Sequence, residues 1–152
     1  MGSVYEVYIA GSAGAPMTRV PQVMAVADRG LEGDRYCLGK GSFSRWPDSG
    51  RAVTCIARET IEAVLSEFGI DLSAGRSRRN IVTEGVGLEA LNGKKFRIGQ
   101  ALLRGSRVAA PCKYLERLTE AGVFEALRGR GGLRADILEA GVISEGDLIV
   151  PV

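Results

Sequence analysis

The 152-residue sequence contains no histidine. This absence excludes Ser-His-Asp and Cys-His catalysis, and every histidine-ligated metal site, within the chain, because each of them needs an imidazole. Any chemistry must therefore use a thiol, a carboxylate, an amine, a guanidinium or a bound cofactor.

An excess of one charge and long apolar runs are also missing. The 20 basic and 18 acidic residues give a net charge of +2, whereas nucleic-acid-binding proteins usually carry a strong basic excess. The apolar stretches are far too short to span a membrane. No basic segment followed by an apolar run opens the sequence, so no secretory signal is expected. We therefore expect a cytoplasmic protein that binds neither nucleic acid nor membranes.

Cysteine occurs three times, as Cys37, Cys55 and Cys112. An odd number of cysteines without an export signal argues against a disulfide framework. No C-x-x-C spacing is present, so a structural zinc site is not indicated. Cys55 lies in the apolar run 52–56 and Cys37 in a glycine-rich stretch, and both are interpreted as structural thiols.

Short apolar segments separated by glycine-containing turns predominate, and they predict a mostly β protein with one domain over residues 1–152, a barrel or a sandwich. The expected strands are 4–9, 20–26, 52–56, 80–83, 95–98, 102–108, 135–138 and 148–150. Ile61, Val64, Leu65 and Phe68 form one apolar stripe at helical spacing, and Gly69 can end that helix. We expect the helix to cover the sheet. Weaker helical patterns span 113–118 and 122–127.

Cys112 is the strongest candidate for chemistry. It follows Pro111 at the end of an expected strand, and proline restricts the backbone there. The expected helix after it and the neighbouring Lys113 both favour the thiolate, which is the nucleophilic and metal-binding form of cysteine. The alternative is a buried cysteine that acts as a small apolar side chain.

Two further segments are candidates for binding. Arg76-Ser77-Arg78-Arg79-Asn80 is a compact cationic patch before a strand, suited to phosphate or carboxylate, or else a solvated loop. Leu31-Glu32-Gly33-Asp34-Arg35 contains a turn glycine and a possible ion pair, and could line a pocket or be a structural turn. We expect Arg78 and Asn80 to line one pocket with Cys112, and strand alternation would point Arg79 the other way.

These segments, with 91–99, 132–135 and Gly146-Asp147, resemble in order the MOSC domain family, named for the C-terminal domain of molybdenum cofactor sulfurases. The resemblance implies a MOSC-type β-barrel with a few short covering helices. It also implies that Cys112 ligates molybdenum or carries sulfur. The cofactor-binding residues would be Arg78, Arg79, Asn80, Gly33, Asp34, Arg35 and Lys113. Tyr114 stands where many relatives have histidine, and Ala109 and Ala110 stand where they have a polar residue or a second cysteine.

The resemblance leaves three functions open. The first is a protein that binds the molybdenum cofactor (molybdopterin) through Cys112 and reduces small N-hydroxylated compounds with an electron-donating reductase. The second is a sulfur carrier, in which a cysteine desulfurase loads a persulfide onto Cys112 for the assembly of metal–sulfur cofactors. The third is a non-catalytic anion-binding or adaptor domain, and in isolation the chain could also bind no cofactor.

Overall fold

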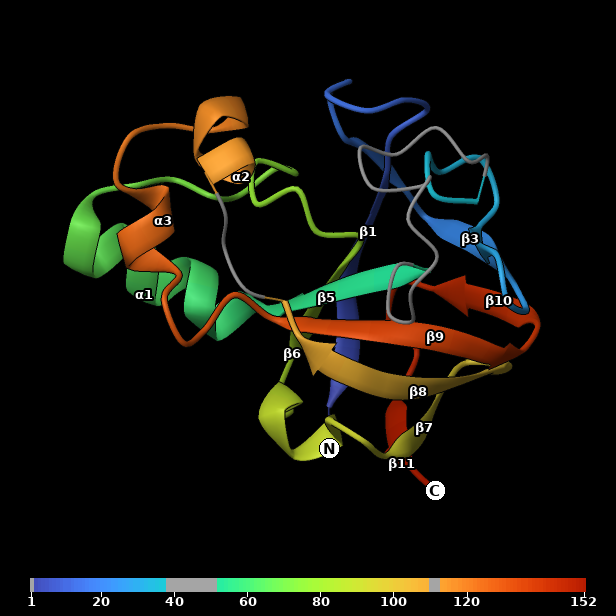
Figure 1. The fold of residues 1–152 in the computed structure, drawn as a ribbon. Helices are drawn as coiled ribbons and strands as arrows, with labels where there is room; N and C mark the ends of the chain where they lie inside the picture. Colours follow the sequence, from blue (N-terminus) through green and yellow to red (C-terminus); the bar gives the residue numbers. More distant parts are fainter. Residues whose placement is uncertain (1, 38–51, 110–112) are drawn as a thin grey trace.

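The computed structural model describes residues 2–37, 52–109 and 113–152, which form two β-sheets and a few short helices (Figure 1). The larger sheet has the strand order β11 (Ile149–Pro151), β7 (Lys95–Ile98), β8 (Ala101–Val108), β9 (Leu133–Glu139), β5 (Val53–Ala57), β6 (Ile81–Glu84), β1 (Ser3–Ile9) and β2 (Thr18–Val20). The smaller sheet has the order β10 (Gly141–Ser144), β3 (Gln22–Val26) and β4 (Gly30–Leu31). The helices are α1 (Arg58–Phe68), α2 (Lys113–Leu118), α3 (Val123–Ala126) and the 3-10 helix η1 (Leu88–Leu91). Mostly β architecture with few helices is therefore confirmed.

The expected closed barrel is wrong, because the sheets are open among the described strands. The end strands β11 and β2 do not pair with each other. Near Ser3, β1 meets the segment before β11 through a single bridge to Leu148, while its other end, Val7–Ile9, pairs with β2. Both end strands have three residues, and Pro151 of β11 has no N–H to donate to a further strand.

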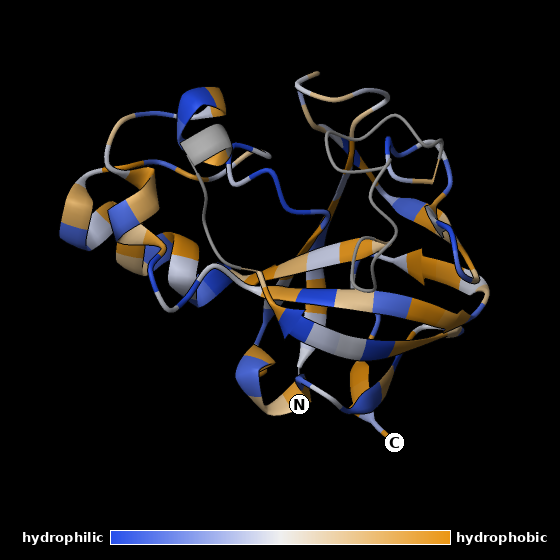
Figure 2. Cartoon of the chain, viewed as in Figure 1, coloured by the Kyte–Doolittle hydropathy of each residue, from blue (hydrophilic) through white to orange (hydrophobic). Residues whose placement is uncertain are grey.

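The hydrophobic pattern explains the strands. In Figure 2 the ribbon of β9 alternates between hydrophobic and hydrophilic residues over most of its length, which is the period of a half-buried strand. Strand β8 instead begins with the three buried apolar residues 101–103. The inward side chains Phe96, Leu103 and Ile137 are buried at the centre of the main core. All expected strands overlap an observed one, whereas β4 and β10 were not predicted from the sequence.

Strands β5 and β6 are the parallel pair of a sheet whose other pairs are antiparallel. A parallel pair needs a crossover connection, and α1 provides it. The segment 69–80 then returns from α1 to the start of β6. This connection brings residues 77–80 next to the first residues of β5 and the last residues of β1.

Helix α1 covers the sheet as expected, packing on β5 and β6, but its apolar stripe is only partly buried. Val64 is fully buried in a second core cluster, which also contains Tyr8, Ile56 and Val82 of the sheet. Leu65 and Phe68 are 51% and 46% exposed, because the helix turns only its Ile61–Val64 side toward that cluster. The expected helix end is confirmed, since Gly69 has a φ of 68° and donates its N–H to the carbonyl oxygen of Leu65. In the described part of the chain, no helix is both long and apolar enough to cross a membrane.

Candidate functional site

Residues 77–80 end the segment that leads from α1 to β6, and their side chains are buried. Ser77, Arg78, Arg79 and Asn80 are each at most 9% exposed, so the alternative of a solvated loop does not apply to them. It applies to Arg76, which is exposed and pairs with Asp71 at 2.9 Å. The observed strand begins only at Ile81 and Arg78 has a φ of 62°, so the strand alternation used to orient Arg79 does not hold here.

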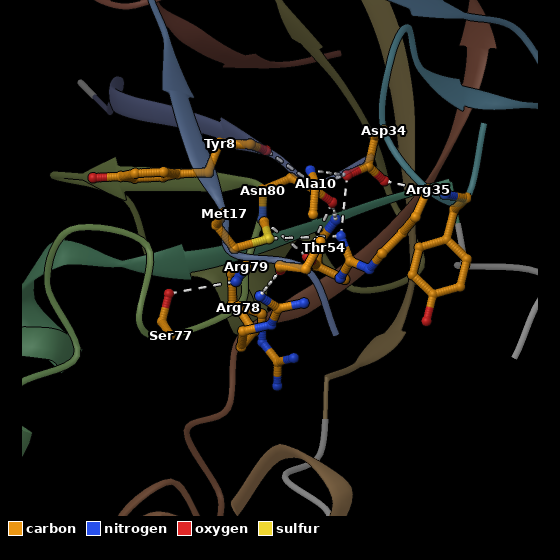
Figure 3. Close-up of polar contacts among 12 residues, drawn as sticks. Tyr8, Ala10, Met17, Asp34, Arg35, Thr54, Ser77, Arg78, Arg79 and Asn80 are labelled. Carbon is orange, nitrogen blue, oxygen red and sulfur yellow. Dashed lines mark hydrogen bonds and ion pairs between the residues drawn. The ribbon is translucent and has the colours of Figure 1, made fainter. Parts of the chain in front are cut away.

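The carboxylate of Asp34 is fully buried and is the centre of a hydrogen-bond network (Figure 3). Its Oδ1 accepts from the Ala10 N–H at 3.0 Å, from Arg35 Nη1 at 3.0 Å and from Asn80 Nδ2 at 3.2 Å. The ion pair expected between Asp34 and Arg35 is thus present. Gly33, with a φ of 83°, makes the turn that presents both side chains. The network joins the segment Gly33-Asp34-Arg35 to the segment Arg78-Arg79-Asn80, although 46 positions separate Asp34 from Asn80.

The Asn80 amide is used entirely within the fold. Its Oδ1 accepts from the Thr54 N–H at 3.1 Å and from Thr54 Oγ1 at 3.2 Å. Its Nδ2 donates to the Tyr8 carbonyl at 3.1 Å as well as to Asp34. Asn80 therefore fastens β5, β1 and the Asp34 segment together, and its role in cofactor binding stays a prediction.

Three arginines converge beside this network. Figure 3 shows the side chains of Arg35, Arg78 and Arg79 extending into one region below Asp34 and Asn80. Arg35 contacts the Met17 sulfur at 3.7 Å and its guanidinium lies 4.9 Å from the centre of the Tyr36 ring. Arg78 donates to the Ala15 carbonyl. We name Asp34, Arg35, Arg78 and Arg79 the arginine cluster. Its composition, three guanidiniums to one carboxylate, suits a bound anion.

Arg79 connects this cluster to the strand end that leads to Cys112. Its Nε donates to the Gly131 carbonyl at 2.9 Å and its Nη2 to the Ala109 carbonyl at 3.2 Å. Ala109 comes three positions before Cys112 in the sequence, so Arg79 contacts the last described residue before the Pro-Cys motif. Cys112 itself lies outside the described residues, as does the side chain of Lys113. The placement of both in the pocket stays a prediction.

An open cavity of about 700 Å³ adjoins the arginine cluster at Arg78. This volume is in the range of small-molecule sites. Its lining combines apolar side chains with charged ones and comprises Gly14, Pro16, Met17, Asp71, Leu72, Ala74, Gly75, Arg76, Arg78, Leu118, Thr119 and Glu120. Within residues 2–37, 52–109 and 113–152, no group of three potential metal ligands from His, Cys, Asp and Glu occurs. The guanidinium and apolar side chains of this lining suit an organic anion.

The network also contains a residue that the sequence analysis missed. Thr54 is buried in β5 and bonds Asn80 through both its backbone and its hydroxyl. A hydroxyl within the apolar run 52–56 was the available signal, because a buried polar side chain needs a partner.

Cys55 is the structural thiol that its apolar surroundings in the sequence indicated. Cys55 is buried in the main core, and this burial raises the pKa of its thiol to about 12. A thiol with that pKa stays protonated at neutral pH and is a poor nucleophile. Cys37 is half-buried.

Comparisons with known proteins identify the fold and the family of the chain. The structure resembles YuaD from Bacillus subtilis, with a TM-score of 0.78, 15% identity and coverage of 98% of this chain and 94% of that one. YiiM from Geobacillus stearothermophilus gives 0.74 and 16%, covering 100% and 75%, and YiiM from Escherichia coli gives 0.71 and 21%, covering 99% and 69%. At these identities the likeness shows the fold. No curated protein matches the sequence. The family model of the MOSC domain matches residues 31–150, and the chain therefore belongs to the MOSC domain family.

Proposed function

We propose that the protein binds the molybdenum cofactor, with Cys112 as the metal ligand. The family is commonly associated with this cofactor. The observation that carries the proposal is the arginine cluster, in which Arg79 contacts Ala109 at the end of β8. A pterin cofactor needs both features, a cationic site for its phosphate and a soft ligand for its metal.

The residues present fit such a group in their chemistry. Guanidinium forks match the geometry of phosphate oxygens, and they stay charged at every accessible pH. A thiolate is a soft ligand of the kind that binds soft metal centres. In this proposal Arg35 and Arg78 hold the phosphate, Gly33 and Asp34 orient Arg35, and Lys113 adds positive charge beside Cys112. When bound, the cofactor supplies oxygen-atom and electron-transfer chemistry.

The cavity at Arg78 offers space for a small-molecule substrate. Met17, Leu72 and Leu118 provide apolar surface, and Arg78 provides a hydrogen-bond donor. We propose that N-hydroxylated compounds are reduced in this region with electrons from a partner reductase. The alternative is that Cys112 accepts a persulfide from a cysteine desulfurase. The cofactor-binding protein and the sulfur carrier both use the Cys112 thiol. The remaining alternative, an anion-binding adaptor, would use the arginine cluster alone.

The test is elemental and pterin analysis of the protein purified from a host that makes the cofactor. Wild type should contain molybdenum and pterin, Cys112→Ser should lose the metal while staying folded, and Arg78→Ala should retain less pterin. Arg97→Ala is the matched control, because it removes an exposed arginine paired with Glu139, and it should keep wild-type content.

The same samples separate the alternatives. A mass increase of one sulfur atom on Cys112, without molybdenum, would support the sulfur carrier instead. Wild-type metal and pterin content in Cys112→Ser, together with no sulfur adduct on Cys112 of the wild type, would defeat both functions that depend on the cysteine and leave the anion-binding or adaptor domain.

A further inference from the structure

A second cavity lies on the side of the sheet that carries α1, between α1, β1 and residues 71–74. Its volume is about 620 Å³, which is also in the range of small-molecule sites. It borders the cavity at Arg78 along Met17, Asp71 and Ala74, which line both. Its described lining contains no member of the arginine cluster. We name this second hollow the outer cavity and treat it as a separate site.

The outer cavity presents apolar side chains to solvent. Tyr5 of β1 is 37% exposed and Leu65 of α1 is 51% exposed, and both line the cavity. The half-buried Ile61 and the buried Val82 continue this apolar surface between them. Exposed apolar side chains that gather in one hollow, rather than singly over the surface, are typical of a binding site.

A first group of charges in the outer cavity is centred on Arg19 of β2. Its guanidinium bonds the Glu145 carboxylate at 2.7 Å and the Glu6 carboxylate at 3.3 Å. Glu6 also accepts the hydroxyl of Tyr8 at 3.1 Å. The hydrogen bond from Arg19 lowers the pKa of Glu145, so this carboxylate is ionised at neutral pH. Two carboxylates on one guanidinium give the group one net negative charge.

A second group of the same composition is centred on Arg58, the first residue of α1. Its guanidinium bonds Glu84 at 2.9 Å and Glu62 at 3.0 Å, and it lies 4.3 Å from the centre of the Tyr5 ring. This group also carries one net negative charge. The Glu62 side chain is 62% exposed, and its contact with Arg58 is made through Oε1. A carboxylate accepts several hydrogen bonds, so Glu62 can also accept one from a ligand.

The remaining charged side chain of the described lining is Asp71, which Arg76 balances at 2.9 Å. The outer cavity therefore combines apolar side chains with two groups that each have a net negative charge. This balance is opposite in sign to that of the arginine cluster and to the net charge of +2 of the whole chain. An anionic ligand would be repelled here, whereas a cationic one is attracted.

We propose that the outer cavity binds small organic ammonium ions that carry an apolar body. The apolar body contacts Tyr5, Ile61 and Leu65, and the ammonium group donates to the Glu62 carboxylate. This site goes beyond the proposed function, because it uses neither the arginine cluster nor a cofactor.

The test is a titration of the 152-residue chain, followed by amide NMR, with three probes of similar shape and different charge. They are benzylammonium, the neutral benzyl alcohol and the anionic benzoate. Benzylammonium should shift the amide signals of Tyr5, Ile61 and Leu65 with a dissociation constant on the order of 10 mM, as expected for a ligand of its size. It should bind about two- to fivefold more tightly than benzyl alcohol, which is the gain from an exposed ion pair. Benzoate should bind more weakly than benzyl alcohol.

Two pairs of variants on α1 locate the site, and all four positions are exposed, so the variants should fold. Leu65→Lys places a positive charge in the apolar part and should weaken benzylammonium binding at least about fivefold. Its control is Phe68→Lys, since Phe68 is 46% exposed but lies outside the described lining. Glu62→Gln should reduce the preference for benzylammonium over benzyl alcohol to less than about twofold. Its control is Glu67→Gln, since Glu67 also pairs with an arginine, Arg130, at 3.0 Å.

Several results would overturn the proposal. Equal affinities for benzylammonium and benzyl alcohol, or tighter binding of benzoate, would show that charge does not select the ligand. The absence of saturable shifts at Tyr5, Ile61 and Leu65 would show that the ligand does not bind in the outer cavity. Equal effects within either pair of variants would exclude the proposed contacts. None of these readouts depends on molybdenum or pterin content, so the outcome is independent of the function proposed for the arginine cluster.

Discussion

Replacing Asn80 by alanine should destabilise the fold far more than the loss of one surface amide would. The change removes the acceptor of the Thr54 N–H and the donor to the Tyr8 carbonyl, both in a buried region. A buried polar group left without its partner costs about 1–3 kcal/mol. Asp34 keeps its bonds from Ala10 and Arg35. We therefore expect a loss of roughly 3–5 kcal/mol in the free energy of unfolding, which is a large part of the total of a typical domain.

The assay is equilibrium unfolding in urea, read as a lower midpoint with an unchanged slope. Thr83→Val is the matched control, because Thr83 lies in β6, is equally buried and makes one long bond of 3.5 Å to the Ile56 carbonyl. It should cost less than about 1 kcal/mol. If Asn80→Ala destabilises no more than Thr83→Val, the Asn80 network does not hold the site together.

Three other predictions concern the fold around the site. Gly132→Ala should cost at least about 2 kcal/mol more than Gly129→Ala in thermal unfolding, since both have positive φ but a Cβ would clash only at Gly132. Burial raises the pKa of Cys55 from 9.0 to about 12, so its contribution to stability is complete below pH 9 and is lost as the pH rises toward 12, which urea titrations across that range would detect. Val64→Ala should cost about 2 kcal/mol and Leu65→Ala under about 1 kcal/mol, because only Val64 is buried; equal losses would contradict the observed orientation of α1.

Much of the secondary structure could be predicted because it depends on local patterns. Strand alternation and the glycine at position 69 are short-range signals, and the predicted elements follow them. Burial of α1 could not be predicted in the same way. A stripe of apolar residues shows that one face could be buried, but the area of core available to cover Leu65 and Phe68 depends on distant segments.

In the candidate site, too, local sequence was sufficient for some features, whereas others depend on contacts between distant segments. Residue types and motif order were enough to select Asp34, Arg78 and Asn80. Their functions within the network depend on contacts across 46 or more positions, which no spacing rule supplies. Arg78 also has a left-handed backbone, so an argument from strand alternation could not orient Arg79. A buried hydroxyl such as Thr54 signals that a partner exists without identifying it.

The wide sequence separation of the Arg79 bonds has a consequence during synthesis on the ribosome. Tyr8, Asp34 and Thr54 all precede Asn80 in the chain, so its partners have left the ribosome before Asn80 does. Gly131 follows Arg79 by 52 positions, which at ribosomal speeds takes roughly 3–10 s. During that interval the bond from Arg79 Nε to the Gly131 carbonyl cannot form. The Asn80 bonds thus depend only on earlier segments, whereas those of Arg79 are completed only after the residues just before β9 have been made.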